Sequence, residues 1–237
     1  MTVNYGTSIV TSGLTMMLDA ANPRSYLGTG TAWSDLSGNS NNATLVHTPV
    51  YSTNNNGYFT FTSASSQYAN LGSPASLGNI KSTLTISAWV TLSSFPTSGN
   101  IFAIYSTGQS GSTSTQTLLR VDNTSVSQVV VGSYNGSSSF LTTYSTTNLS
   151  LNTWYNIVGQ YTGTAWVLYV NGVQVNSTTT TGPVSASVIV TIGVENNGGT
   201  LQRYFGGNIS SVSVYNRSLS ASEIQQNFNA YRGRYGI

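Results

Sequence analysis

Charged side chains are scarce in this sequence of 237 residues, and cysteine is absent. Asp, Glu, Lys and Arg make up 5% of the chain, against roughly 25% in an average domain. A long soluble helix needs such residues on its exposed face, so a helical protein is excluded. The net charge is +2, and no basic cluster precedes Arg232 and Arg234, which excludes a nucleic-acid-binding stripe. Without cysteine, the chain has no disulfide, iron–sulfur or thiol chemistry.

Acidic residues and histidine are also few, which limits the reactions that the chain could catalyse. Glycoside hydrolysis usually uses two carboxylates that flank the scissile bond. The five acids are spread along the chain, and no two of them have the spacing of neighbours on one strand face. The single histidine, His47, cannot build a multi-histidine metal site, and no Gly-x-Ser-x-Gly motif frames a serine nucleophile. We therefore predict that the protein has no catalytic residues and is not an enzyme.

Long apolar runs are missing as well. The N-terminal sequence MTVNYGTSIV lacks a charged segment followed by an apolar run, so we expect no secretory signal. No apolar stretch reaches the length of about 18 residues that a membrane span requires. Turn-forming residues recur along the whole chain, without a linker or a repeat. We therefore predict one domain over residues 1–237.

Hydroxyl, amide and aromatic side chains are abundant in place of charged ones. Ser, Thr and Asn supply 95 residues, and the chain has 15 Tyr, 7 Phe and 4 Trp, a mixture typical of β-structure. The alternation over 84–92 predicts a strand with one face in a core and the other partly wet. Asn171-Gly172 predicts a type I′ hairpin turn. Further strands are predicted at 14–18, 58–61, 101–105, 117–121, 127–131, 154–161, 165–170, 188–192 and 208–215.

One helix is predicted near the end of the chain. Ser220 and Glu223 match a capping box, and Leu219 and Ile224 match a hydrophobic staple. Ile224 and Phe228 lie at helical spacing, which gives the helix a narrow apolar stripe that should dock on the sheets. The fold that we predict is all-β, an antiparallel two-sheet sandwich with one short C-terminal helix. Its edge strands would carry little charge, so we expect neighbouring chains to cover some of them in a homo-oligomer or a larger assembly.

Four segments carry a resemblance to a known family. They are Leu18–Leu45, Leu84–Val90, Asn152–Val175 and Tyr204–Ile237. The last is the most specific, since a strand ending in Tyr-Asn-Arg leads into a helix with Leu-Ser, Glu-Ile and Asn-Phe-Asn. The segments resemble the laminin-G-like, concanavalin A-like jelly-roll domains of the lectin/glucanase superfamily, above all the version in structural proteins of tailed phages and other large viruses of aquatic hosts. The resemblance implies a jelly-roll sandwich, on a scaffold that hosts lectins, glycosidase accessory modules, adhesins and capsid decorations.

Calcium is the one cofactor that the sequence leaves open. Many relatives carry an acidic motif after an early Phe, but the matching stretch 61–68 has no carboxylate, which puts a site built on those acids in question. Asp122 and Glu195, each followed by Asn on a predicted loop, are weak candidate calcium ligands. Alternatively, the two carboxylates are solvated or pair with Arg120 and Arg203.

Carbohydrate binding makes smaller demands on the sequence. Aromatic rings stack on the C–H faces of sugars, and amide or guanidinium donors bind the hydroxyls. The candidates of these types on predicted loops are Asn197, Arg203, Tyr204, Tyr134 and Tyr144.

These observations lead to two hypotheses about function. The first is a non-enzymatic virion structural protein, a capsid decoration or tail-associated protein that displays a carbohydrate- or surface-binding face in many copies. Its partners would be the major capsid protein or other virion proteins, further copies of the chain and a cell-surface glycan, but no nucleic acid and no membrane. The alternative is a free bacterial lectin or adhesin module at the cell surface or outside the cell.

Overall fold

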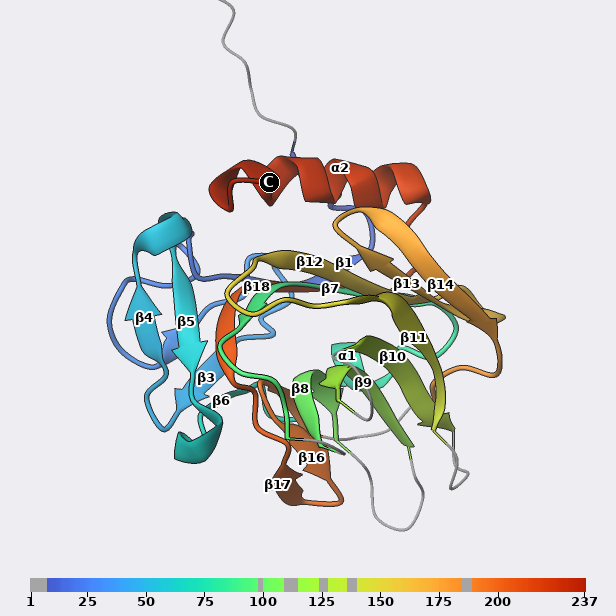
Figure 1. Ribbon diagram of the computed structural model, residues 1–237, viewed down its shortest axis with the longest axis horizontal. Helices are drawn as coiled ribbons and strands as arrows, with labels where there is room; N and C mark the ends of the chain where they lie inside the picture. Colours follow the sequence, from blue (N-terminus) through green and yellow to red (C-terminus); the bar gives the residue numbers. More distant parts are fainter. Residues whose placement is uncertain (1–7, 98–99, 109–114, 124–127, 136–139, 185–188) are drawn as a thin grey trace, which may run out of the picture.

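The computed structural model describes residues 8–97, 100–108, 115–123, 128–135, 140–184 and 189–237. Two antiparallel sheets face each other across a core, and a helix runs over the outer face of one of them (Figure 1). The predicted two-sheet sandwich with a C-terminal helix is confirmed. No helix in the described residues is both long and apolar enough to cross a membrane.

The first sheet lies directly beneath the C-terminal helix. In the described residues it has eight strands, in the order β14-β13-β12-β7-β18-β5-β4, and β1 pairs with β18 beside β5. The strands are β1 (Leu14–Asp19), β4 (Val50–Ser52), β5 (Tyr58–Phe61), β7 (Leu84–Leu92), β12 (Tyr155–Tyr161), β13 (Ala165–Val170), β14 (Val173–Thr179) and β18 (Gly207–Tyr215).

The second sheet lies on the other side of the core. Its strand order in the described residues is β11-β10-β9-β8-β15-β6-β3-β2, and a separate hairpin, β16-β17, projects from it. The strands are β2 (Ala32–Trp33), β3 (Ala43–Val46), β6 (Tyr68–Asn70), β8 (Ile101–Thr107), β9 (Thr115–Asp122), β10 (Gln128–Asn135), β11 (Leu141–Asn148), β15 (Val190–Ile192), β16 (Glu195–Asn197) and β17 (Thr200–Gln202).

Short helices complete the chain. A four-residue helix, α1 (Ala75–Gly78), precedes β7, and α2 (Ala221–Tyr231) follows β18. The described residues also form three short 3₁₀ helices, η1 (Asn54–Asn56), η2 (Ser63–Ser65) and η3 (Arg232–Arg234).

Strand β7 shows how the sequence pattern and the packing differ. Its alternate apolar residues, from Leu84 to Leu92, point into the core between the sheets, as predicted. The prediction of a partly wet opposite face is wrong, because all nine residues of β7 are buried. Trp89, on that opposite face, is 2% exposed. The helix α2 covers this face, so a strand whose sequence alternates is nevertheless buried on both sides.

The helix α2 begins and docks as the sequence predicts. The Ser220 hydroxyl accepts from the Glu223 amide at 3.2 Å, and the Glu223 carboxylate accepts from the Ser220 amide at 2.8 Å. Leu219 and Ile224 are buried in one cluster, and the Phe228 ring stacks on Trp89 at 5.7 Å. The apolar stripe is therefore the face by which α2 contacts the first sheet.

The C-terminal residues extend this contact beyond the helix. The Tyr235 ring lies 4.2 Å from Trp89, between centroids. Arg234 donates to both oxygens of Asp19, at 3.0 and 2.9 Å, and Asp19 is 1% exposed. One arginine of the basic C-terminal pair therefore fixes the tail to β1.

The two sheets meet along one side of the sandwich. Asn176 of β14 donates to the Tyr144 carbonyl of β11 at 2.7 Å, and Thr146 donates to the Val175 carbonyl at 3.2 Å. At the opposite ends of the sheets, the edge strands β4 and β2 have three and two residues. The fold itself therefore protects its edges by contact and by shortness, whereas coverage by neighbouring chains stays a prediction.

Some predicted boundaries differ from the structure. Trp154 lies just before β12, not in it, and is only partly buried. Tyr134 and Tyr144 lie on β10 and β11, where loops were predicted. In β11 the residues on the inner face include Thr143 and Ser145, both 1% exposed, so the segment shows no apolar alternation. The predicted strand ends at 127 and 188 lie outside the described residues.

Candidate functional site

The β16-β17 hairpin interrupts the stretch of chain that runs beside β8 in the second sheet. Beside β8, the Gly193 amide donates to the Ile104 carbonyl at 2.9 Å, and the Ala103 amide donates to the Arg203 carbonyl at 3.0 Å. The Phe205 amide donates to the Gly193 carbonyl at 2.8 Å, which closes the base of the hairpin. The chain therefore runs beside β8 at Gly193, turns away from it over residues 194–202, and is hydrogen-bonded to β8 again at Arg203. In Figure 1 the hairpin projects at the bottom, on the side away from α2.

The turn of the hairpin has a simple cause in the sequence. Gly198 and Gly199 both have positive φ, 62° and 92°. A two-residue hairpin turn of type I′ requires positive φ at both of its central residues. The Asn196 side chain accepts from the Gly199 amide at 2.9 Å and holds the turn. Asn197, a predicted carbohydrate-binding residue, lies beside this turn and is exposed.

Arg203 is anchored through both its backbone and its side chain. Its φ of 59° lies in the left-handed region, which costs an L-residue roughly 1–2 kcal/mol. Its guanidinium forms an ion pair with Glu195 of β16, and the two side chains are 34% and 3% exposed. Strained backbone persists where the surroundings hold it, and such positions cluster at functional sites.

Tyr204 begins a row of rings that runs across the surface. Its ring lies 6.3 Å from Tyr68, and Tyr68 lies 6.4 Å from His47, both in edge-on geometry. The His47 Nδ1 lies 2.9 Å from the Ser66 carbonyl oxygen. A tyrosine hydroxyl is ordinarily neutral and able to donate at physiological pH, and burial, with secondarily the neighbouring Tyr204, raises the pKa of Tyr68 further.

A cavity of about 500 Å³ opens to solvent beside Arg203 and Tyr204. The Phe95 ring, 39% exposed, lines the same cavity. Aromatic rings and polar groups therefore share one concave surface, as in sites that bind polar organic ligands. The lining residues are Ser63, Ala64, Ser94, Phe95, Thr97, Asn100, Ile101, Phe102, Arg203 and Tyr204.

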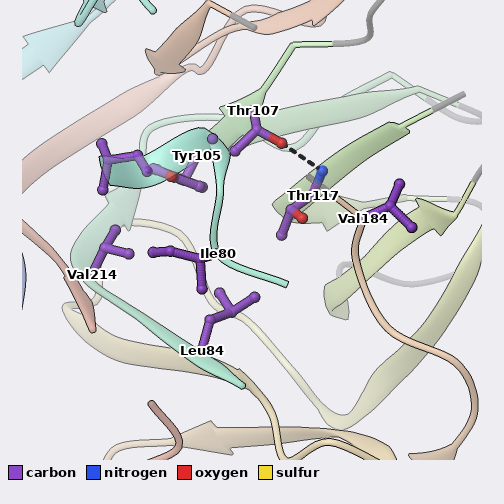
Figure 2. A pocket seen from close by; sticks show the side chains of 9 residues that line it. Ile80, Leu84, Tyr105, Thr107, Thr117, Val184 and Val214 are labelled. Atoms are coloured by element: carbon purple, nitrogen blue, oxygen red, sulfur yellow. Dashed lines mark hydrogen bonds between the residues drawn. The ribbon is translucent and has the colours of Figure 1, made fainter. Parts of the chain in front are cut away.

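Two other cavities offer less. One of about 490 Å³ surrounds Lys81 and Asn216, and its described lining has no aromatic ring. The other lies between Ile80, Leu84 and Tyr105 at the α1 end of the core (Figure 2). Its volume of about 10 Å³ leaves room for no more than one water molecule. The cavity beside Arg203 is therefore the better candidate.

All five carboxylates lie in the described part of the chain, and each is engaged. Asp19, Asp122, Glu195 and Glu223 form ion pairs with Arg234, Arg120, Arg203 and Arg217. Asp35 accepts from the amides of Met17, Ser37 and Asn41 at 2.8 to 3.0 Å.

The two candidate calcium ligands, Asp122 and Glu195, form ion pairs with arginines, which was the alternative that the sequence left open. Asp122 lies 3.2 Å from Arg120, and Glu195 pairs with Arg203. Their predicted loop positions are wrong, because Asp122 ends β9 and Glu195 begins β16, and both are buried. No group of three or more His, Cys, Asp or Glu in the described residues could hold a metal ion.

The predicted carbohydrate-binding residues do not form one site. Arg203 and Tyr204 line the cavity together, whereas Asn197 lies on the adjoining hairpin. Tyr134 lies on β10, with its ring centroid 5.0 Å from that of Phe140, and Tyr144 lies on β11. The strands β11 and β10 form one end of the second sheet. The sheet order therefore separates the two tyrosines from Arg203.

Sequence analysis missed Phe95, Asn100 and Tyr68. Phe95 lies three residues after the end of β7 and precedes Pro96, so an aromatic residue stands in the segment after a strand where the chain must turn. That pattern was a usable signal. Asn100 and Tyr68 come to this region only through the pairing of β8, β15 and β6, which no local pattern reveals.

Comparisons with known proteins place this geometry in a family. A profile of the concanavalin A-like lectin/glucanases superfamily, of laminin G type, matches residues 62–225. Domain 4 of AbnA, a GH43 extracellular arabinanase from Geobacillus stearothermophilus, solved in complex with arabinotriose, matches with a TM-score of 0.69 at 16% identity, over 91% of this chain and 98% of that one. No curated protein matches the chain.

Two toxin domains share the fold over a smaller part of their length. The binding domain of Paraclostridial Mosquitocidal Protein 1 matches with a TM-score of 0.70 at 15% identity, over 92% of this chain and 52% of that one. The binding domain of botulinum neurotoxin DC, in complex with SialylT, matches with a TM-score of 0.67 at 13% identity, over 93% and 52%. This chain thus spans about half of each toxin domain. With a profile match over more than half of its residues, the chain belongs to the concanavalin A-like lectin/glucanases superfamily.

Proposed function

We propose that this protein is a carbohydrate-binding module without catalytic activity, and that the cavity beside Arg203 is its binding site. The observation that carries the proposal is the meeting of Phe95, Tyr204 and Arg203 around one open cavity of about 500 Å³. Sugars present C–H faces that pack on rings and hydroxyls that bind to polar groups. The cavity offers both kinds of surface within one depression.

The donors of this site are held in place before a ligand arrives. Arg203 is fixed by the hydrogen bond that its backbone carbonyl accepts from the Ala103 amide, and by the ion pair of its side chain with Glu195. Asn100 donates to the Thr97 hydroxyl at 3.3 Å and accepts from the Ile101 amide at 3.0 Å. A group that is already ordered loses less conformational entropy on binding, so a shallow site gains affinity from this order.

The state of the carboxylates supports a binding role over hydrolysis. A glycosidase needs an acid and a nucleophile or base that can reach the substrate. Here four acids are committed to arginines and Asp35 to backbone amides. None of the five lines the cavity.

The relatives favour the same class of ligand. The arabinanase domain was solved with arabinotriose and the botulinum toxin domain with SialylT. At 16% and 13% identity, these ligands suggest a chemical class for this chain and no particular sugar.

The setting that we propose is a virion, where the chain would decorate a capsid or tail in many copies, in contact with the major capsid protein or other virion proteins. The support is the sequence resemblance to phage and large-virus proteins, together with the scarcity of surface charge. Repetition on a particle raises avidity by about 10²–10⁴ over a single weak site. A free bacterial lectin or adhesin at the cell surface, or outside the cell, is the alternative.

Two measurements test these proposals. On a glycan array, the purified chain should bind at least one class of saccharide, Tyr204→Ala should weaken that binding, and Tyr144→Ala should keep it. Loss with Tyr144→Ala alone would move the site to the β10–β11 end, and no binding to any glycan would refute the module. Mass spectrometry of purified virions that does not find the chain would remove the virion setting.

A further inference from the structure

The cavity beside Arg203 has a charge balance of zero. Arg203 is the only Arg, Lys, Asp or Glu among its described lining residues, and its guanidinium is paired with the buried carboxylate of Glu195. We infer that this cavity selects uncharged oligosaccharides and discriminates against acidic ones. The inference rests on the proposed function and names the ligand class of the same site.

The neutralising carboxylate cannot turn away to release the arginine. Glu195 is 2% exposed and is fixed in the β16-β17 ladder opposite Gln202. The Gln202 side chain lies 3.5 Å from the same oxygen that Arg203 contacts. An acidic ligand would thus have to compete with a carboxylate that is already in place and already ordered.

The next arginine along the sheet is neutralised in the same way. Ala103, which donates to the Arg203 carbonyl, is the register partner of Arg120 on β9. Arg120 lies 3.2 Å from Asp122, and its guanidinium also lies over the Phe140 ring at 4.4 Å. An acidic sugar in the cavity would therefore lose hydration of its carboxylate and gain no uncompensated positive charge in return.

The uncommitted part of Arg203 suits sugar hydroxyls. Its guanidinium has five N–H donors in a planar fork, and Nη1 is the atom that contacts Glu195. With 34% of the side chain exposed, the other edges of the fork can donate to neutral oxygens. Such a paired arginine acts as a fixed hydrogen-bond donor with little net field.

The surface beyond the cavity favours a chain of sugars over a single ring. Tyr204 is at the cavity, Tyr68 follows at 6.3 Å, and His47 follows Tyr68 at 6.4 Å. All three are at least partly exposed. Several rings in a row offer successive sugars of an oligosaccharide their own contacts.

The test compares matched ligands that differ in charge. Binding at neutral pH is measured by calorimetry for neutral oligosaccharides such as arabinotriose and N-acetyllactosamine, and for sialylated or uronic-acid-bearing forms of the same chains. The wild type should bind the best neutral ligand at least about tenfold more tightly than its acidic form. Affinity for the neutral ligand should barely change with salt, because no net charge is involved.

A variant separates the charge balance from the shape of the cavity. Glu195→Gln keeps the side-chain size but frees the charge of Arg203, so the acidic form should gain about tenfold relative to the neutral one. Glu223→Gln makes the same change in net charge in the Arg217 pair at α2 and should leave the preference unchanged. Thermal unfolding verifies that both variants are folded; if Glu195→Gln is not, the wild-type comparison and its salt dependence decide alone.

The outcomes distinguish this inference from the proposed function. Tighter wild-type binding of the acidic forms overturns the selectivity and leaves the carbohydrate-binding module intact. An unchanged preference in folded Glu195→Gln also overturns it, since the charge balance would then play no part. Binding of neither series overturns the proposed function, and the selectivity with it.

Discussion

Two groups of aromatic rings lie on opposite sides of this sandwich and have opposite surroundings. Under α2, Trp89 stacks with Phe228 and Tyr235 at 5.7 and 4.2 Å, and all three rings are buried. Beside the β16-β17 hairpin, Phe95 and Tyr204 are exposed to a cavity.

The difference lies in what covers the rings of each group. The rings under α2 have their faces covered by one another, so their contribution is burial and they stabilise the fold. The rings at the cavity are at least partly exposed beside an anchored Arg203. Exposure next to fixed donors, more than aromatic content, therefore marks the candidate site.

The largest expected effect is on the α2 side. Trp89→Ala removes the ring on which Phe228 and Tyr235 stack, and should lower the free energy of unfolding by about 3–5 kcal/mol. Urea unfolding measures this loss. The folded fraction should keep its saccharide affinity, so a change in affinity as large as that of Tyr204→Ala would break the distinction between the two groups.

A smaller loss is expected at the attachment of the tail. Asp19→Asn replaces the carboxylate that accepts two hydrogen bonds from Arg234 and should cost about 1.5–3 kcal/mol, as for other charged hydrogen bonds. The same urea titrations measure it. A loss below a few tenths of a kcal/mol would mean that α2 and the first sheet hold the tail without this pair.

At the cavity the expected effect is on binding. Tyr204→Ala should weaken saccharide binding by about tenfold, or 1.4 kcal/mol, and change the free energy of unfolding less than Trp89→Ala does, because Tyr204 is only partly buried. Calorimetry and urea unfolding give the two quantities. If stability falls as far as in Trp89→Ala, the cavity rings are structural too.

The smallest effect concerns pH. Hydrogen bonds from Arg217 and from the Ser220 amide lower the pKa of Glu223 to about 2. A lowered pKa gives stability that is present above the ordinary value for Glu and is lost as pH falls toward 2. The pair is partly exposed, with 29% of each side chain accessible, so its contribution should stay under about 1 kcal/mol.

The comparison with Glu223→Gln measures this contribution. The difference in free energy of unfolding between wild type and variant should shrink from about pH 7 to about pH 3 and also decrease with salt. No difference between wild type and variant at pH 7 would mean that helix capping, which Gln can also provide, accounts for the whole contribution of Glu223.

Prediction from sequence succeeded where a local pattern carries the information. The capping box of Ser220 and Glu223 and the apolar alternation of β7 each gave an element that the structure contains. It did not succeed for Tyr144, because Ser and Thr at inward positions hide the alternation of β11. Of the candidate site residues, Arg203 and Tyr204 meet at the cavity, while Phe95 joins them from the segment that follows β7.

The sequence by itself determined the class of fold and the types of side chain that the fold can present. Few ionisable groups, abundant hydroxyls and rings, and alternating strands lead to a β-sandwich that presents polar and aromatic surface. Only the tertiary structure decided which rings are buried and which charges are paired. The physical reason is that charges pair according to how the strands are ordered and connected: Glu195 and Arg203 are brought together by the β16-β17 hairpin, and Arg234 reaches Asp19 from the other end of the chain.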